Sequence, residues 1–185
     1  LLESVDEGTA ERDAVEAIRE AGERGAALTR QLLAFGRKQV LSVAVVDLNQ
    51  VIEQLGKMLA RLLGEDIDCV FRLQPGLQTI RADVTQLDQI LINLAVNARD
   101  AMPRGGRLEV ETGELALAGP SAAFPEAQAG TYVALTVRDN GCGMDEETLS
   151  HAFEPFFTTK GMGKGSGLGL AIVFGIVQQN QGVIQ

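Results

Sequence analysis

The sequence predicts an α+β fold, in which helices cover one face of a mixed β-sheet and a long bundle-forming helix precedes them. Helical and strand-like patterns follow one another in the order α, α, β, β, α, β, β, α, α, which is typical of that class. Residues 14–35 place apolar or small side chains at alternating spacings of four and three, which is a heptad seam. Of the 185 residues, 45% are hydrophobic and 22% charged, as in ordinary globular domains.

The heptad seam predicts a helix from a bundle, and the bundle is expected to be dimeric. Small seam residues would let partner helices approach closely, and an amphipathic helix packed on its own domain is the alternative. The seam positions are Ala14, Ile18, Ala21, Gly25, Leu28, Leu32 and Phe35. We therefore place one region at residues 1–43 and a second domain at residues 44–185.

The second domain is expected to hold four helices and four strands. An extended link over 40–47 leads to the first helix, which Asp47 or Asn49 caps and which ends at Leu63. The other helices are expected from Asp83 to just before Pro103, from Asp145 onward, and over 167–179. The strands are expected over 69–73, 79–82, 107–112 and 132–139, with a surface excursion before the last and a further strand beginning at 183–185.

Charge and composition exclude several classes of protein. Sixteen Lys and Arg oppose 25 Asp and Glu, giving a net charge of −9, which disfavours a nucleic-acid binder. Cys69 and Cys142 are far apart and fit no zinc or redox spacing, as expected for free thiols in the cytoplasm. The longest apolar run is about half the ~20 residues of a membrane span, so no direct membrane insertion by this segment is expected.

A row of polar side chains interrupts the apolar face of the helix that begins at Asp83. Asn93, Asn97 and Asp100 are spaced i, i+4 and i+7, which places them along one line of the helix. Oxygen-bearing side chains in such a row can hold Mg²⁺, which also bridges to phosphates. A solvated helix face is the alternative.

Asp139 follows an apolar strand and precedes the glycines Gly141 and Gly143. A carboxylate fixed at a strand end, beside glycines that admit a flat ring, suits adenine. Asp139 can accept a hydrogen bond from the exocyclic amine, whereas guanine presents a carbonyl at that place. A simple Asn-Gly turn is the alternative.

Alternating glycines over 161–169 lead directly into an apolar helix. Free backbone amides at a helix N-terminus bind anions, although the spacing matches neither a Walker loop nor a dinucleotide fingerprint. Phe153, Phe156 and Phe157 lie just before these glycines, where they either anchor a mobile lid or only pack as a satellite of the core. A flexible linker is the alternative for the glycines themselves.

Together these segments resemble the catalytic and ATP-binding domain of sensor histidine kinases, in the Bergerat-fold superfamily with gyrase and mismatch-repair ATPases. Residues 93–100 look like the N box, 139–144 like the first glycine box, 153–160 like the F box, and 163–170 like the second glycine box. The resemblance covers roughly residues 45–185. Residues 28–38 are similar to the second helix of the family's dimerisation and histidine-phosphotransfer hairpin.

The resemblance implies a Bergerat-type α/β sandwich that binds ATP and Mg²⁺, with Asn97 as the metal ligand and Asn93 and Asn97 as catalytic residues. Asn93 stands where the superfamily's ATPases are expected to carry a glutamate base, which favours phosphoryl transfer to a protein group over hydrolysis. The residues implied at the nucleotide are Asn97, Asp100, Asp139, Gly141, Gly143, Thr159, Lys160, Gly163, Lys164, Gly165, Ser166, Gly167, Leu168 and Gly169.

The expected function is transfer of the ATP γ-phosphoryl group to a histidine on an upstream helix outside this chain, for relay to a response regulator. The one histidine of the chain, His151, lies just before the F box and not on a hairpin helix. The expected partners are a second copy of the protein, bound through the N-terminal helix, and a receiver domain. A tether to the membrane outside this chain, and a C-terminal strand left incomplete at Gln185, fit the same resemblance. A Bergerat-fold ATPase and a non-catalytic nucleotide-sensing module are the alternatives.

Overall fold

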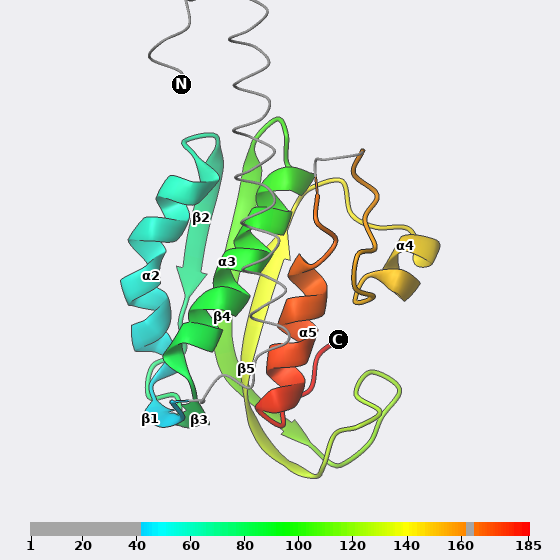
Figure 1. Ribbon diagram of the computed structural model, residues 1–185. Coiled ribbons are helices and arrows are strands. Elements are labelled where there is room, and N and C mark those ends of the chain that lie inside the picture. Colours follow the sequence, from blue (N-terminus) through cyan, green and yellow to red (C-terminus); the bar gives the residue numbers. More distant parts are fainter. Residues whose placement is uncertain (1–41, 162–164) are drawn as a thin grey trace, which may run out of the picture. The chain divides into compact units, whose positions relative to one another are not determined.

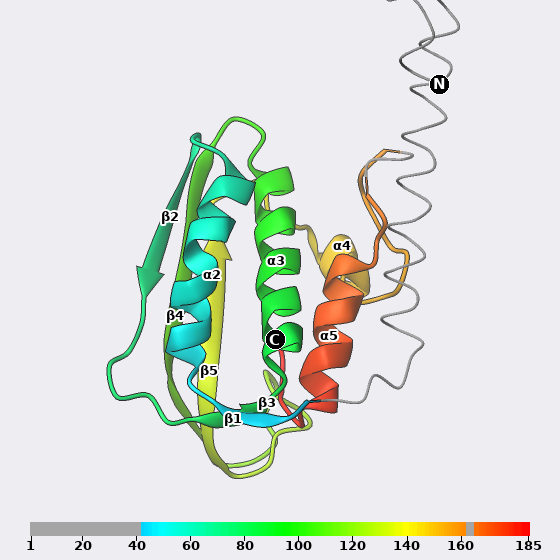
Figure 2. The ribbon, with the colours of Figure 1, turned by 60° about the vertical axis from the view of Figure 1, so that its left-hand side comes forward.

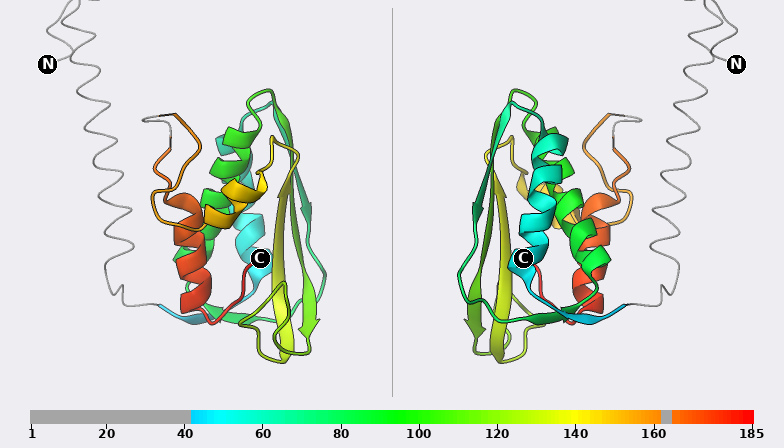
Figure 3. Two further views of the ribbon diagram at one scale, coloured as in Figure 1. Left: turned by 90° about the vertical axis from the view of Figure 1, so that its right-hand side faces the viewer. Right: turned by 90° about the vertical axis from the view of Figure 1, so that its left-hand side faces the viewer.

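A computed structural model describes residues 42–161 and 165–185 of the chain. The chain divides into two units between Val40 and Leu41, and the described residues belong to the second unit. In that unit the helices α2 (Leu48–Leu63), α3 (Val84–Ala101) and α5 (Gly169–Gln179) lie on one face of a three-stranded sheet (Figures 1 and 3). The heptad helix predicted over residues 14–35 lies outside the described residues.

The three-stranded sheet has the order β2–β4–β5. β2 (Ile67–Arg72) runs parallel to β4 (Gly106–Leu117), and β4 runs antiparallel to β5 (Gly130–Asp139), so the sheet is mixed. The inward side chains of Leu108 and Val110 on β4 are each 1% exposed. The other face of β4 carries ion pairs with Arg72 of β2. Alternation of buried and charged side chains along β4 confirms the predicted α+β class with helices on one sheet face.

The largest differences from the sequence prediction concern β1 (Ala44–Val46), β4 and α5, while β2, β3 (Ile80–Ala82) and β5 differ from it by one or two residues at an end. The expected link over 40–47 contains the strand β1, which pairs antiparallel with β3 and buries Val46. β4 continues to Leu117, five residues beyond the predicted end, because it pairs with β5 along the whole of that length. α5 begins at Gly169 and not at 167, because the backbone at Gly167 has φ +63°, which a right-handed helix does not accommodate.

The strand expected to begin at 183–185 is absent from this structure, which assigns no strand to these described residues. Ile184 packs instead against the apolar cluster that joins α3 to α5, formed by Ile90, Leu168, Ile172, Val173 and Ile176. Ile184 is only partly buried in this contact.

Aspartate side chains cap three of the helices. Asp47, and not Asn49, caps α2, because its Oδ1 accepts hydrogen bonds from the amides of Asn49 (2.9 Å) and Gln50 (3.4 Å). Asp83 caps α3 as predicted, through the amide of Thr85. Asp145 caps the short helix α4 (Glu146–His151). The side-chain oxygens satisfy amides that have no partner inside the helix, which fixes where each helix starts.

α3 and α5 lie side by side and run in opposite directions (Figures 1 and 2). At one end, Gln86 near the start of α3 exchanges hydrogen bonds with Gln179 and Asn180 at the end of α5. At the other end, Asn97 of α3 faces Gly169, the first residue of α5. This second end is where the predicted site residues gather.

Candidate functional site

The polar row of α3 is partly covered by other parts of the protein and is not fully exposed to solvent. Asn93, Asn97 and Asp100 are all partly buried, so the solvated-face alternative does not describe them. The Nδ2 atom of Asn93 is buried without a hydrogen-bond partner among the described residues. A buried amide without a partner costs free energy, so a group that accepts its hydrogen bond would be stabilised there.

Asn97 is placed against the N-terminus of α5. A Cβ atom on Gly169 would come within 3.3 Å of Asn97 Nδ2 and 3.5 Å of its Oδ1, so the carboxamide lies directly beside this glycine. No side chain caps α5 through Leu168, its N-cap residue. The amides of the first helical turn therefore keep their capacity to bind an anion, next to a carboxamide oxygen that can bind a cation.

Asp100, one turn further along α3, forms an ion pair with Lys160 of the F box. The distance from Lys160 Nζ to Asp100 Oδ2 is 2.6 Å, and 60 residues separate the two in the sequence. Two residues that the sequence predicts to contact the nucleotide, Asp100 and Lys160, are thus bonded to each other. Thr159 precedes Lys160 and is exposed.

The first glycine box is held at the end of β5 by backbone contacts. Asp139 is exposed, and its Oδ1 accepts a hydrogen bond from the Gly141 amide at 2.9 Å, so the chain bends directly after the strand. A Cβ at Gly141 would lie 2.6 Å from the carbonyl oxygen of Ala101, so only glycine fits against the end of α3 there. Gly143 has φ +68°, another position that favours glycine.

The described part of the second glycine box packs against the F box. Phe156 donates a backbone hydrogen bond to the carbonyl oxygen of Gly167 at 2.9 Å, and a Cβ at Gly167 would collide with the Phe156 carbonyl. Gly165 lies over the stem of Lys160. The Ser166 Oγ accepts a hydrogen bond from the Leu168 amide (3.3 Å). Gly163 and Lys164 lie outside the described residues.

The F-box phenylalanines are spread over three environments. Phe153 packs against Phe174 of α5, and Phe157 packs against His151, with ring centroids 5.4 Å apart in both pairs. Phe156 is 59% exposed and has φ +70°, which is unusual for a residue with a side chain. None of the three is buried, so simple packing in a satellite core does not account for them.

Sequence reasoning missed two residues that shape the site. Asn140 Oδ1 accepts a hydrogen bond from the Arg107 amide at 2.7 Å, which ties the first glycine box to the start of β4. Arg99 contacts Asp100 Oδ1 at 3.3 Å and the Leu62 carbonyl oxygen at 3.2 Å. The Asn-Gly pair marked a turn, but the partner of Asn140 lies on the neighbouring strand β4, 33 residues away in the sequence, and leaves no local pattern.

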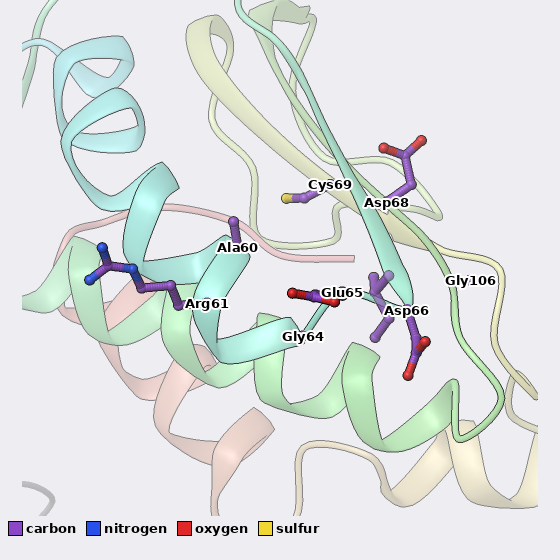
Figure 4. A pocket seen from close by; sticks show the side chains of 9 residues that line it. Ala60, Arg61, Gly64, Glu65, Asp66, Asp68, Cys69 and Gly106 are labelled. Atoms are coloured by element: carbon purple, nitrogen blue, oxygen red, sulfur yellow. The ribbon is translucent and has the colours of Figure 1, made fainter.

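A groove of about 770 Å³ lies elsewhere, between the C-terminal end of α2, β2 and the start of β4 (Figure 4). No predicted site residue lines it. Its lining contains the carboxylates of Glu65, Asp66 and Asp68 beside one cation, Arg61. Such a surface repels a polyphosphate, so the groove is not a candidate for the nucleotide site.

The comparison with protein families agrees with this geometry. Residues 82–185, which hold all four boxes, match the family described as "Histidine kinase-, DNA gyrase B-, and HSP90-like ATPase". The chain belongs to this family. The resemblance to a sensor histidine kinase catalytic domain is therefore confirmed, and with it ATP as the ligand class.

The curated relatives of the chain are sensor kinases. It is 44% identical over 171 residues to the sensor kinase CckA of Brucella abortus (strain 2308), which is 90% of this chain and 18% of CckA. It is 36% identical to the sensor histidine kinase ZraS of Klebsiella oxytoca, over 96% of this chain and 35% of ZraS. The chain thus spans about a fifth to a third of the length of these relatives.

Solved structures show the same fold. Full-length ShkA in complex with AMPPNP matches with a TM-score of 0.70 and 28% identity, over 96% of this chain and 35% of ShkA. The mycobacterial sensor histidine kinase MprB matches with a TM-score of 0.58 and 26% identity, over 75% of this chain and 80% of the MprB chain. Within residues 42–161 and 165–185, no helix is long and apolar enough to cross a membrane.

Proposed function

We propose that this chain is the catalytic, ATP-binding part of a sensor histidine kinase, which transfers the γ-phosphoryl group of Mg-ATP to a histidine outside the chain. The observation that carries the proposal is the position of Asn97 beside the uncapped N-terminus of α5. The N-terminus of α5 can bind the negatively charged phosphates, and the carboxamide oxygen of Asn97 can bind the metal cation beside them.

Asp139 is proposed to select adenine. Its Oδ1 is engaged by the Gly141 amide, which orients the carboxylate and leaves Oδ2 to accept a hydrogen bond from the exocyclic amine. Guanine would present a carbonyl oxygen to the same carboxylate, and two acceptors repel each other. A Cβ at Gly143 would meet no atom within 4 Å, so the space beside this residue is open to the ring, while Gly141 packs against the end of α3.

The phosphates are proposed to lie at Gly165–Gly169 and the start of α5, with Lys160 and Lys164 as cations. Asn97 is the proposed Mg²⁺ ligand, and bound Mg²⁺ would supply charge stabilisation at the transferred phosphoryl group. Among the described residues no cluster of three or more His, Cys, Asp or Glu could hold a metal. One amide ligand suits Mg²⁺, which keeps several waters and binds through substrate phosphates.

Asn93 favours transfer to a protein group over hydrolysis, because a carboxamide cannot take a proton from water at neutral pH. Its Nδ2, which has no partner among the described residues, retains the capacity to donate a hydrogen bond to an oxygen of the ligand. His151 is not the proposed acceptor, since its ring contacts Glu154 at 2.8 Å and packs against Phe157. The acceptor is expected on a partner helix of the bundle to which residues 14–35 would belong.

Nucleotide binding is tested by calorimetry with ATP and GTP, each with and without Mg²⁺. Wild type is expected to bind ATP more tightly than GTP, and Asp139→Asn to lose most of that preference. Glu114→Gln on the far part of β4 removes one negative charge away from the site and serves as the control. Equal affinity of the wild type for ATP and GTP would exclude the adenine assignment.

Phosphotransfer is tested with γ-labelled ATP, first on this chain and then on a longer chain that includes the upstream helix. The longer chain is expected to gain acid-labile label and to pass it to a receiver domain of a response regulator. Sedimentation of both chains tests the proposed dimer, with Leu32→Glu as the variant that should weaken it. Efficient labelling of this chain that His151→Ala removes would show that the acceptor assignment is wrong.

A further inference from the structure

The ion pair between Lys160 and Asp100 joins two of the four boxes. Its 2.6 Å distance is short for an ammonium and a carboxylate, and the side chains are 34% and 25% exposed. Lys160 ends the F box, and Asp100 ends the polar row that Asn93 and Asn97 begin on α3. The cation expected to meet phosphate is therefore already neutralised by a carboxylate of the protein.

Lys160 is held in this position by its neighbours. Gly165 lies over its stem, so that a Cβ there would come within 3.1 Å of Lys160 Cδ and 2.9 Å of Thr158 Oγ1. The Lys160 amide donates to the same Thr158 oxygen at 3.2 Å. The Lys160 side chain as a whole is 34% exposed, so the ammonium is reached by solvent and a change of rotamer can give it another partner.

Asp100 has a second cation in reach. Arg99 Nη2 lies 3.3 Å from Asp100 Oδ1, while Arg99 Nη1 is anchored on the Leu62 carbonyl oxygen at 3.2 Å. Departure of Lys160 would therefore not leave the partly buried carboxylate alone. This lowers the cost of breaking the Lys160–Asp100 pair, because an uncompensated charge is what makes such breakage expensive.

We propose that Asp100 competes with the nucleotide phosphates for Lys160 and thereby weakens nucleotide binding. In this structure the ammonium is bonded to Asp100. In the nucleotide complex it is bonded to phosphate, and Asp100 retains Arg99. When the nucleotide leaves, Asp100 takes the lysine back, which favours release. This inference rests on the proposed function, since it requires that the phosphates reach Lys160.

The test is a double-mutant cycle on the 185-residue chain, with ATP and ADP affinities measured by calorimetry at fixed Mg²⁺. The variants are Asp100→Asn, Lys160→Met and the double variant. Asp100→Asn keeps the shape of the side chain and Lys160→Met keeps most of the stem. Asp68→Asn on β2 removes the same charge from a carboxylate paired at 3.8 Å with Arg107, and is the matched control. Thermal melting shows that each variant is folded.

Asp100→Asn is expected to bind ATP about fivefold more tightly, as suits the strength of a partly exposed ion pair. In the Lys160→Met background the same substitution should change affinity less than about twofold, because the competition acts through the lysine. Asp68→Asn should leave affinity unchanged.

Three outcomes would overturn the competition. Unchanged or weaker ATP binding by Asp100→Asn would show that the carboxylate does not compete. Equal tightening with and without Lys160 would show that Asp100 acts by simple repulsion of the phosphates. Equal tightening by Asp68→Asn would show an effect of net charge alone. Failure of the wild type to bind ATP would contradict the proposed function instead, and this result is distinct from the other three.

Discussion

The two ends of the α3–α5 pair differ in how their polar groups are satisfied. At the closed end, near Gln86, the side-chain amides of Gln86, Gln179 and Asn180 bond to one another and to the Ile176 carbonyl oxygen. At the open end, near Asn97, the helix α5 has no side-chain cap and Asn93 Nδ2 is buried without a partner among the described residues. The same two helices thus carry a completed network at one end and an incomplete one at the other.

We therefore expect the closed end of the helix pair to contribute to stability and the open end to ligand binding. Buried polar groups normally have partners, and the closed end obeys that rule with Gln86 6% exposed. The open end departs from it at Asn93, which the sequence assigns to catalysis, one helical turn from the expected metal ligand Asn97. An incomplete polar network in a well-packed domain is expected where a ligand supplies the missing partners. The comparison therefore predicts that substitutions at the two ends will affect different measurements.

The largest effect is expected from Asn97→Ala at the open end. Loss of the metal-binding carboxamide should weaken Mg-ATP binding on the order of 100-fold and metal-free ATP binding much less. The melting temperature should stay within a few degrees of wild type. Calorimetry with and without Mg²⁺ measures both effects, and equal losses under the two conditions would contradict a metal role.

Gly167→Ala is expected to have the next largest effect. A Cβ would lie 2.4 Å from the carbonyl carbon of Phe156, at a backbone φ of +63°. Strain and displacement should lower the free energy of unfolding by about 2 kcal/mol and weaken ATP binding, since the loop before α5 must shift.

Gly175→Ala in α5 is the matched control for Gly167→Ala. Gly175 is helical, and a Cβ added there would meet no atom within 4 Å, so alanine should raise stability by up to about 1 kcal/mol. Chemical denaturation of both variants gives the comparison. Equal effects of the two substitutions would show that the contact with Phe156 does not constrain the loop.

Local patterns predicted α3 and the four boxes because their causes lie within a few residues. The Asp83 cap, the 3.6-residue apolar period and Pro103 placed α3 close to its observed bounds, Val84–Ala101. The assignments of Asn97 and Asp139 remain proposals, but the structure puts Asp139 at the end of β5, as its neighbours in the sequence predicted. The contact of Asn97 with Gly169 at the start of α5 was not predicted.

Features that depend on distant partners could not be predicted in this way. The Lys160–Asp100 pair spans 60 residues, and neither position has a local pattern that names the other. β1 has three residues and exists because β3 pairs with it. The 183–185 segment has strand-forming residues, yet Ile184 packs against helices. In each case tertiary contacts decide the outcome over intrinsic preference.

Asn180→Ala makes the same substitution as Asn97→Ala, at the closed end. It leaves Gln86 Oε1 without the hydrogen bond from Asn180 Nδ2, while the Ile176 carbonyl oxygen keeps only the bond from the backbone amide of residue 180, which should lower the free energy of unfolding by about 1–2 kcal/mol. Affinity for Mg-ATP should not change. Denaturation and calorimetry on this pair of variants compare the two ends directly, and a loss of affinity in Asn180→Ala would mean that the two ends are coupled.

The smallest expected effect concerns Asp83, which caps α3 at its closed end. Burial alone would raise the pKa of this carboxyl, but hydrogen bonds from the Ser42 and Thr85 amides outweigh burial and lower the pKa below its ordinary value. Asp83→Ala should cost about 1 kcal/mol of stability at pH 7, the usual value of a helix N-cap.

The pH dependence of the stability lost in Asp83→Ala distinguishes the contribution of the carboxylate charge from that of the capping hydrogen bond. Because the folded pKa is lowered, the ionised carboxylate contributes its full stabilisation above the ordinary aspartate pKa and loses it as pH falls through the lowered folded value. The difference in unfolding free energy between wild type and Asp83→Ala should therefore be constant from about pH 7 to pH 5 and shrink below about pH 4. Asp83→Asn keeps a side-chain acceptor without the charge, so its difference from Asp83→Ala should not depend on pH. Urea denaturation of the three proteins from about pH 7 to pH 3 measures both differences, and a wild-type advantage that persists undiminished at the acid end would contradict the assignment of the stabilisation to the ionised cap.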